Sequence, residues 1–92
     1  MKHLKIKVFG KVQGVYYRAT AVEKAKKYGI RGFVRNELDG SVYIEAEGDE
    51  VNLHLYVEWC RTGSALAVVE KLEVEEGELK PYKSFITIRE HS

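Results

Sequence analysis

Residues 31–47 read RGFVRNELDGSVYIEAE, and this stretch decides the fold because it predicts two strands joined by a tight turn. The segments RGFVRNE (31–37) and SVYIEAE (41–47) have the composition of strands. Between them lies LDG, and its pair Asp39-Gly40 is among the strongest short signals for a β-hairpin. The centre of the sequence therefore predicts an antiparallel pair of strands.

The residues before the hairpin predict a strand and a helix. Residues 3–9 alternate, with Leu4, Ile6 and Val8 on one face and lysines on the other, as in a half-buried strand. Residues 19–28, ATAVEKAKKY, have an apolar side suited to a helix, and Gly29 is placed to end it.

The residues after the hairpin predict a second helix and two strands. Asp49 is the expected N-cap of the helix, which ends near Gly63. Strands are expected at 67–76 and 85–90. This order predicts an α+β, ferredoxin-like βαββαβ sandwich with an antiparallel sheet of four to five strands and two helices on one face. Residues 1–92 are expected to form a single domain.

Composition and charge limit the class of protein. With one cysteine, Cys60, no internal disulfide can form. The first residues are too charged for a signal peptide and no run is long enough to cross a bilayer, so we expect a cytoplasmic protein. Residues 1–36 carry ten Lys or Arg and one acid, whereas residues 37–92 carry five Lys or Arg and thirteen acids. Either the basic half attracts anions or the two halves interleave and their fields cancel.

Several catalytic and metal-binding patterns are absent from the sequence. His3, His54 and His91 have no ligand spacing with one another or with Cys60, so no metal site is expected. The sequence contains no motif typical of a serine nucleophile paired with a histidine base. Cys60 is interpreted as a packing residue.

The segment GKVQGVYYR, residues 10–18, lies between the first strand and the first helix. A glycine-containing loop there can turn backbone N–H groups inward around an anion, and the N-terminus of the helix adds further N–H groups and a positive dipole end. Gly14 permits a backbone conformation that other residues avoid, and Arg18 can offer two N–H groups to phosphoryl oxygens. Spacing alone leaves an ordinary turn as an alternative.

GKVQGVYYR (10–18) and GFVRNELDGSVYIEAEG (32–48) together resemble the acylphosphatase family, whose pattern is G-x-V-Q-G-V-x-[FY]-R followed by G-x-V-x-N-x-x-D-G-x-V. The resemblance covers nearly the whole chain. It implies a small α/β sandwich that hydrolyses the carboxyl–phosphate bond of acyl phosphates with no metal or other cofactor. It also implies that Arg18 and Asn36 are catalytic and that a phosphate-binding loop is formed by Gln13, Gly14, Val15, Tyr16, Tyr17 and Arg18.

The residues agree with that chemistry and also depart from the family in places. We expect Arg18 and the loop amides to hold the phosphoryl group while Asn36 orients a water for direct attack. Tyr16 adds bulk where the family often has a small residue, and residues 62–69 lack the usual proline of the turn before the fourth strand. The side chain of Gln13 is expected to contact loop backbone rather than ligand.

Other interpretations stay open from the sequence. The same cradle could serve a binding module without turnover, Arg18 could form a surface ion pair, and Asn36 could be a turn residue. An RNA platform with Tyr43 as a stacking residue has little support. The partners expected are a small acyl phosphate and inorganic phosphate, with no nucleic acid and no membrane, and the chain is expected to be a monomer rather than a homodimer.

The second helix has more apolar residues than one face requires. Val51, Leu55 and Trp59 are expected to face the core, and a second stripe contains Leu53, Val57 and Cys60, with Tyr56 between the two. A broadly buried helix and a self-association surface are the two explanations. The acidic residues 73–78 are expected to be a solvated strand end.

Overall fold

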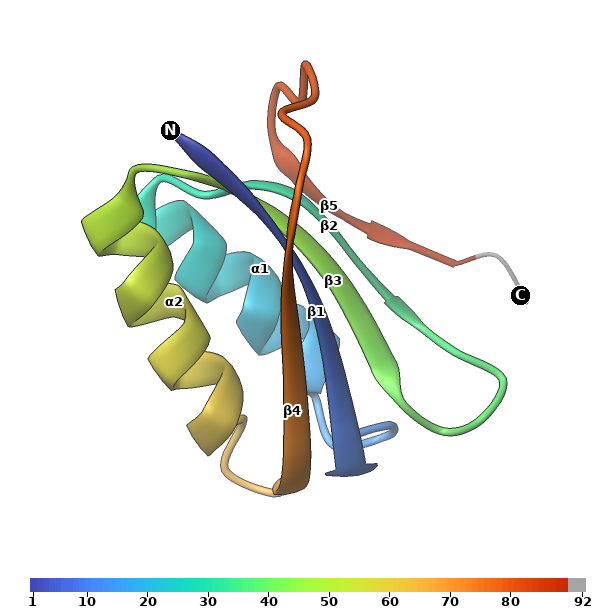
Figure 1. Cartoon of the computed structure of the whole chain (residues 1–92). Helices are drawn as coiled ribbons and strands as arrows, with labels where there is room; N and C mark the ends of the chain where they lie inside the picture. The colour runs from blue at the N-terminus through green and yellow to red at the C-terminus, as the bar shows by residue number, and fades with distance from the viewer. Residues whose placement is uncertain (90–92) are drawn as a thin grey trace.

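The computed structural model describes residues 1–89 as five strands and two helices (Figure 1). In chain order these are β1 (Lys2–Lys11), α1 (Tyr17–Tyr28), β2 (Arg31–Asn36), β3 (Val42–Gly48), α2 (Glu50–Thr62), β4 (Val68–Gly77) and β5 (Phe85–Ile88). The predicted order of elements is confirmed. The first helix begins at Tyr17 rather than at residue 19, and the last strand ends at Ile88. Residue 90 of the expected last strand, and His91, lie outside the described residues.

The strands form one sheet in the order β4-β1-β3-β2-β5. The pairs β1–β3, β1–β4 and β2–β3 are antiparallel, as expected, but β5 runs parallel to β2 with Gly32 opposite Phe85. The reason is the path of the chain: β4 ends opposite His3, at the end of the sheet where β2 begins, so β5 starts there and runs in the same direction as β2. The sheet is therefore mixed within the predicted ferredoxin-like fold.

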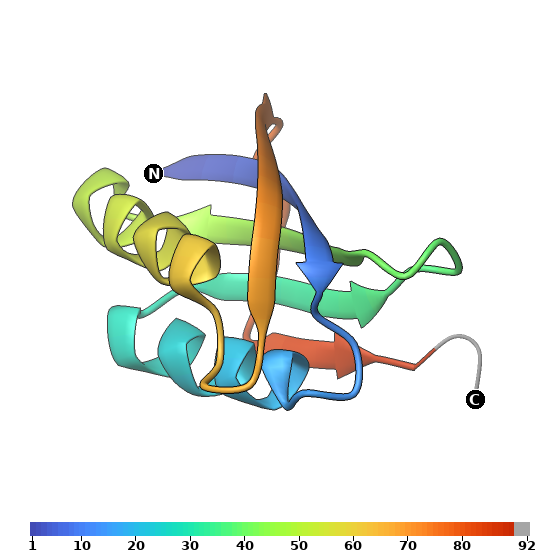
Figure 2. The same cartoon turned by 90° about the horizontal axis from the view of Figure 1, so that it is seen from below.

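Both helices cover the same face of the sheet, as Figures 1 and 2 show. The core between the two layers contains alternate residues of the central strands, such as Ile6 and Val8 of β1 and Ile44 of β3, all of which are completely buried. Two buried tyrosines link the helices to each other. Tyr17 donates from its hydroxyl to the carbonyl of Cys60 at 2.8 Å, and Tyr56 donates to the carbonyl of Ala21 at 3.0 Å. Each phenol thereby satisfies its polar end inside the core.

The prediction that Val51, Leu55 and Trp59 of α2 face the core is wrong. Val51 and Leu55 are 68% and 42% exposed, and Trp59 is only partly buried, where it contacts the rings of Tyr17 and Tyr56. The spacing explains the difference, because positions i, i+4 and i+8 drift around a helix of 3.6 residues per turn, whereas i, i+3, i+4 and i+7 stay on one side. The buried residues follow that second pattern and are Leu53, Tyr56, Val57 and Cys60.

The face of the sheet away from the helices carries a buried polar cluster. The imidazole of His3 lies between two carboxylates, with Nε2 2.8 Å from Glu45 and Nδ1 3.0 Å from Glu47. Tyr82, in the loop that crosses from β4 to β5, stacks on His3 and donates to Glu45 at 3.0 Å. Tyr43 donates to the same carboxylate at 2.7 Å. The cluster therefore attaches the crossing loop to the sheet.

Two further expectations concern the surface. The acidic segment after residue 72 is exposed at every glutamate, as predicted for a solvated strand end. Within residues 1–89, neither helix is long and apolar enough to cross a membrane.

Candidate active site

The loop between β1 and α1 is shaped by backbone conformations that side chains rarely adopt. Gly14 has φ 73°, and the next such residue, Tyr16, has φ 63° although it is not a glycine. A left-handed conformation at a non-glycine residue costs about 1–2 kcal/mol, and such strain is concentrated at functional sites. Tyr16 is 74% exposed, so burial of this residue does not offset the strain.

The N-terminus of α1 is left open for an anion. Tyr16 occupies the N-cap position without any side-chain capping bond, and the first turn of α1 contains no acidic residue. The first helical hydrogen bond runs from the amide of Thr20 to the carbonyl of Tyr16 at 3.1 Å, so the amides of Tyr17, Arg18 and Ala19 precede it. Unpaired amides and the positive dipole end favour a negatively charged ligand at this position.

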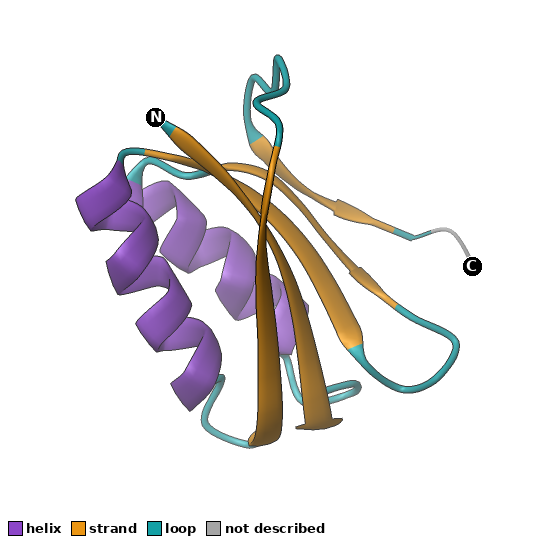
Figure 3. Cartoon of the chain, viewed as in Figure 1, coloured by secondary structure: helices purple, strands orange, loops and turns teal. Residues whose placement is uncertain are grey.

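Contacts from two other loops hold the β1–α1 loop in place. Gln13 donates from Nε2 to the carbonyls of Glu37 and Ser41, at 2.8 Å and 2.9 Å, and so links the loop to the β2–β3 turn. Ser64 donates from its hydroxyl to the carbonyl of Val15 at 2.7 Å. Figure 3 shows that these three loops gather at one end of the molecule. The structural role expected for Gln13 agrees with its contacts, although its partner is the neighbouring turn.

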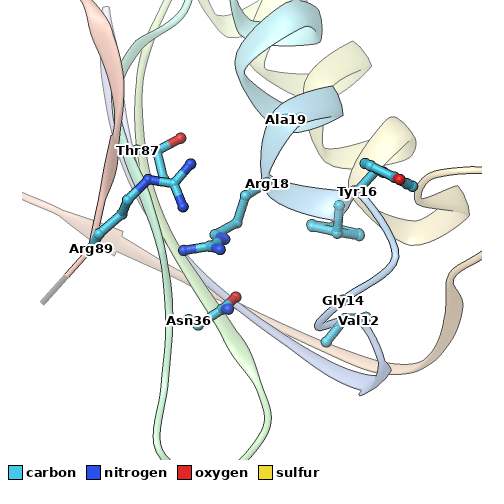
Figure 4. A pocket seen from close by; sticks show the side chains of 9 residues that line it. Val12, Gly14, Tyr16, Arg18, Ala19, Asn36, Thr87 and Arg89 are labelled. Atoms are coloured by element: carbon cyan, nitrogen blue, oxygen red, sulfur yellow. The ribbon is translucent and has the colours of Figure 1, made fainter. Parts of the chain in front are cut away.

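The two motifs meet in a pocket of about 340 Å³ at that end of the sheet (Figure 4). Arg18 from α1 and Asn36 from the last position of β2 both line it. The oxygen Asn36 Oδ1 is buried and has no hydrogen-bond partner among the described residues. A buried acceptor without a donor is unusual and suits a site that receives a polar ligand or a water. The remaining residues around the pocket are Val12, Gly14, Tyr16, Tyr17, Ala19, Thr87 and Arg89.

The charged residues among those described at the pocket are both arginines, Arg18 and Arg89. Burial, and then the charge of Arg89, lower the pKa of Arg18 below its ordinary value. Within residues 1–89 no carboxylate forms an ion pair with Arg18, so the surface ion pair considered for this residue is not observed. Asn36 is the last residue of β2 rather than part of the following turn. An anion in the pocket would offset the repulsion between the two arginines.

The wider charge pattern agrees with interleaved halves. Lys2 in the basic half pairs with Glu50 at 3.1 Å and Glu76 at 3.3 Å, and Lys7 pairs with Asp39 at 3.6 Å.

Among residues 1–89, no group of three or more His, Cys, Asp or Glu side chains is arranged to hold a metal ion.

Comparison with known proteins agrees with this geometry. A sequence model of the family described as Acylphosphatase matches residues 4–87. The chain belongs to the acylphosphatase family. A curated acylphosphatase of Methylococcus capsulatus is 47% identical over 76 residues, which cover 83% of each chain, and one of Marinobacter nauticus is 49% identical over 69 residues, which cover 75% of each. The crystal structure of acylphosphatase from Bacillus subtilis superposes with a TM-score of 0.94 at 36% identity, covering 97% of this chain and 100% of the other.

The acylphosphatase motifs account for only part of the pocket of this chain. Of the loop residues predicted, four line the pocket: Gly14, Tyr16, Tyr17 and Arg18. Gln13 and Val15 do not line it, and they contact neighbouring loops instead, through Glu37 and Ser64 respectively. The proline-free residues 62–69, a departure from the acylphosphatase pattern, do not line it either. Sequence reasoning missed Thr87 and Arg89, because their position depends on the parallel pairing of β5 with β2.

Proposed function

We propose that the chain hydrolyses the carboxyl–phosphate bond of small acyl phosphates and releases a carboxylate and inorganic phosphate. One observation carries this proposal. Arg18 and Asn36 come from separate motifs and line one pocket beside the uncapped N-terminus of α1. The names of the curated relatives support the same reaction.

The phosphoryl group is held in this proposal by Arg18 and by the amides at the start of α1. The guanidinium donates two parallel N–H bonds to two phosphoryl oxygens, and the amides that precede Thr20 donate to the others. Phosphoryl transfer depends mainly on positioning and on stabilising charge, and these fixed donors need no reorganisation during the reaction.

The attacking group is a water oriented by Asn36. The buried oxygen Asn36 Oδ1 accepts a hydrogen bond from this water, and the amide NH₂ can donate to a phosphoryl oxygen. The leaving group is a carboxylate, which is a weak base and departs without being protonated. The reaction therefore requires no strong general acid, in keeping with a pocket lined by no Asp, Glu or His among the described residues. The water attacks phosphorus directly, without a phosphoenzyme.

The test is release of phosphate from acetyl phosphate and benzoyl phosphate in the presence of a chelator. Arg18→Ala and Asn36→Ala should each lower kcat/KM by about 100-fold or more, the loss typical of an oriented donor at a reacting oxygen. Arg31→Ala is the matched control, because Arg31 lies at the opposite end of β2 from Asn36. Turnover that survives both substitutions, or that requires a metal, would contradict the proposal, as would phosphate covalently attached to the protein during turnover.

The cellular setting follows from the same proposal. We expect the chain to act as a single domain and a monomer in the cytoplasm, on free small molecules rather than on nucleic acid or membranes. Sedimentation of the purified chain over a range of concentrations tests the monomer.

A further inference from the structure

Among the described residues that line the pocket, Tyr16 is the one that presents a large apolar side chain to solvent. It is 74% exposed, whereas Val12 and Tyr17, the other two large apolar residues at the pocket, are each 1% exposed. Gly14 has no side chain, and Ala19 offers a single methyl group. A substrate that enters the pocket therefore finds its apolar contact surface mainly at Tyr16.

The fold gains little from the side chain of Tyr16. Among the described residues, no hydrogen bond involves its hydroxyl and no ring packs on its ring, and only its backbone carbonyl is used, as the acceptor for Thr20. Its φ of 63° is a conformation that glycine or asparagine adopts more easily than an aromatic residue. A residue that opposes the local backbone preference, with little burial in return, is expected at a functional site.

The pocket is larger than a phosphoryl group alone requires. Its volume of about 340 Å³ lies within the range of about 300–1,000 Å³ that is typical of sites for whole small molecules. In the proposed function the phosphoryl group takes the part of the pocket beside Arg18 and the amides that precede Thr20. The remaining space is open to the acyl part of the substrate.

The direction of attack favours the loop side of the pocket for the acyl group. In-line displacement needs the water and the leaving group on opposite sides of phosphorus. The proposed water lies at Asn36, the last residue of β2, whereas Tyr16 lies in the loop before α1 (Figure 4). A leaving group that points away from Asn36 therefore points toward the β1–α1 loop, where the exposed ring of Tyr16 lines the pocket.

We propose that Tyr16 is a specificity-determining residue, whose ring packs against the acyl group and favours aromatic acyl phosphates over acetyl phosphate. This inference rests on the proposed function. The methyl group of acetyl phosphate covers little of the tyrosine ring, whereas the ring of benzoyl phosphate packs on it either stacked or edge-on. The contact removes apolar surface of both rings from water, which stabilises the bound benzoyl group.

The experiment measures the ratio of kcat/KM for benzoyl phosphate to kcat/KM for acetyl phosphate. Comparing this ratio between variants removes the intrinsic difference in reactivity between the two substrates. Tyr16→Asn deletes the ring and introduces a residue that tolerates the left-handed backbone, and the ratio should fall about three- to tenfold. Tyr16→Phe keeps the ring without the hydroxyl and should keep the ratio.

A matched control uses an exposed apolar residue elsewhere. Leu79 is 57% exposed in the loop between β4 and β5 and does not line the pocket, so Leu79→Asn should leave the ratio unchanged. Thermal unfolding of each variant shows whether the fold is kept.

Binding without turnover gives a second readout. Benzylphosphonate and methylphosphonate carry an aromatic ring or a methyl group on a phosphonate that water does not cleave, and calorimetric titration measures the Kd of each. In Tyr16→Asn the Kd of benzylphosphonate should rise about three- to tenfold relative to that of methylphosphonate.

The outcomes are distinguishable. A ratio that does not change in Tyr16→Asn would overturn the inference while leaving the proposed function in place. Equal losses for the two substrates would also overturn it, because the side chain would then act on the phosphoryl group or on the loop. A ratio that falls in Tyr16→Phe would rule out an apolar contact by the ring. If the unaltered chain released phosphate from neither substrate, the proposed function would fail and the inference with it.

Discussion

The side chain of Gln13 donates a 2.8 Å hydrogen bond to the backbone carbonyl of Glu37, the residue that follows Asn36. The same nitrogen donates to Ser41 at 2.9 Å, so one side chain joins the β1–α1 loop to both sides of the β2–β3 turn. Arg18 is the second residue of α1, the helix that follows this loop, and Asn36 immediately precedes the turn. The relative position of the two proposed catalytic side chains therefore depends on Gln13.

Gln13→Ala should lower kcat/KM for acetyl phosphate about tenfold or more, because a small displacement of Arg18 relative to Asn36 degrades the attack geometry. The free energy of unfolding should fall by about 1–3 kcal/mol, since two hydrogen bonds are lost. Thr62→Ala removes another bond from a side chain to the backbone, at the end of α2, and serves as the control. Unchanged turnover in Gln13→Ala would show that the loop holds its position without this contact.

Two glycines of the GKVQGVYYR segment should respond differently to alanine. At Gly10, with φ 127°, an added Cβ would lie 2.1 Å from the carbonyl oxygen of Val68, so Gly10→Ala should destabilise by about 3 kcal/mol or more. At Gly14, with φ 73°, an added Cβ meets nothing within 4 Å, so Gly14→Ala should cost only about 1–2 kcal/mol of backbone strain.

Denaturant unfolding of both variants measures this difference. Gly14→Asn is the matched variant, because asparagine tolerates the left-handed conformation, and it should be more stable than Gly14→Ala. If Gly10→Ala and Gly14→Ala lowered the free energy of unfolding equally, two separate roles would be contradicted: packing against β4 for Gly10, and loop conformation for Gly14.

The sequence predicted the elements and the two motifs because each depends on local signals. Asp39-Gly40 and the alternation of residues 3–9 act within a few residues, and so does the N-cap at Asp49, whose carboxylate accepts from the amides of Val51 and Asn52. The features that the sequence did not predict depend on contacts between distant segments of the chain. The parallel pairing of β5, the position of Arg89 and the His3 cluster all require the path of the chain from β4 across the sheet, which no local pattern specifies.

Stability should decrease in alkaline solution. Burial raises the pKa of the Cys60 thiol from 9.0 to about 12, and burial also raises the pKa of Tyr56. Above pH 9 the unfolded chain loses the thiol proton while the folded chain keeps it, so the free energy of unfolding falls as the pH rises from about 9 to 12. Urea unfolding at a series of pH values measures this.

Labelling of the thiol gives an independent check on Cys60. A thiol reagent at pH 8 should react with Cys60 only as the chain unfolds, because the thiolate is the reactive form and the side chain is completely buried. Labelling of the folded chain at the rate of a free thiol would contradict this burial.

Glu45 should contribute more to stability than any exposed acid. Burial alone would raise the pKa of its carboxyl, but hydrogen bonds from Tyr43, Tyr82 and His3 outweigh burial and hold the pKa below its ordinary value. Its contribution is present at neutral pH and is lost as the pH falls through the pKa of the folded state.

Glu45→Ala should destabilise the fold by about 1–3 kcal/mol at pH 7, because Nε2 of His3 and the hydroxyls of Tyr43 and Tyr82 lose their shared acceptor. Glu73→Ala, which removes an exposed pair with Lys71, should cost about 0–1 kcal/mol. Folded Glu45→Ala should keep its kcat, because the cluster lies on the face of the sheet away from the helices. A loss of kcat at full folding would mean that the cluster communicates with the pocket.

Arg18→Lys separates the charge of Arg18 from its geometry. Lysine keeps the positive charge but offers a single ammonium group, whereas the guanidinium can donate two parallel bonds to two phosphoryl oxygens from its fixed plane. We expect kcat/KM to fall about 100-fold and competitive inhibition by phosphate to weaken. Arg31→Lys makes the same exchange at the other end of β2 and should leave both quantities unchanged. If Arg18→Lys kept most of its activity, the site would need only a positive charge at this position, and two-bond recognition of the phosphoryl group would be ruled out.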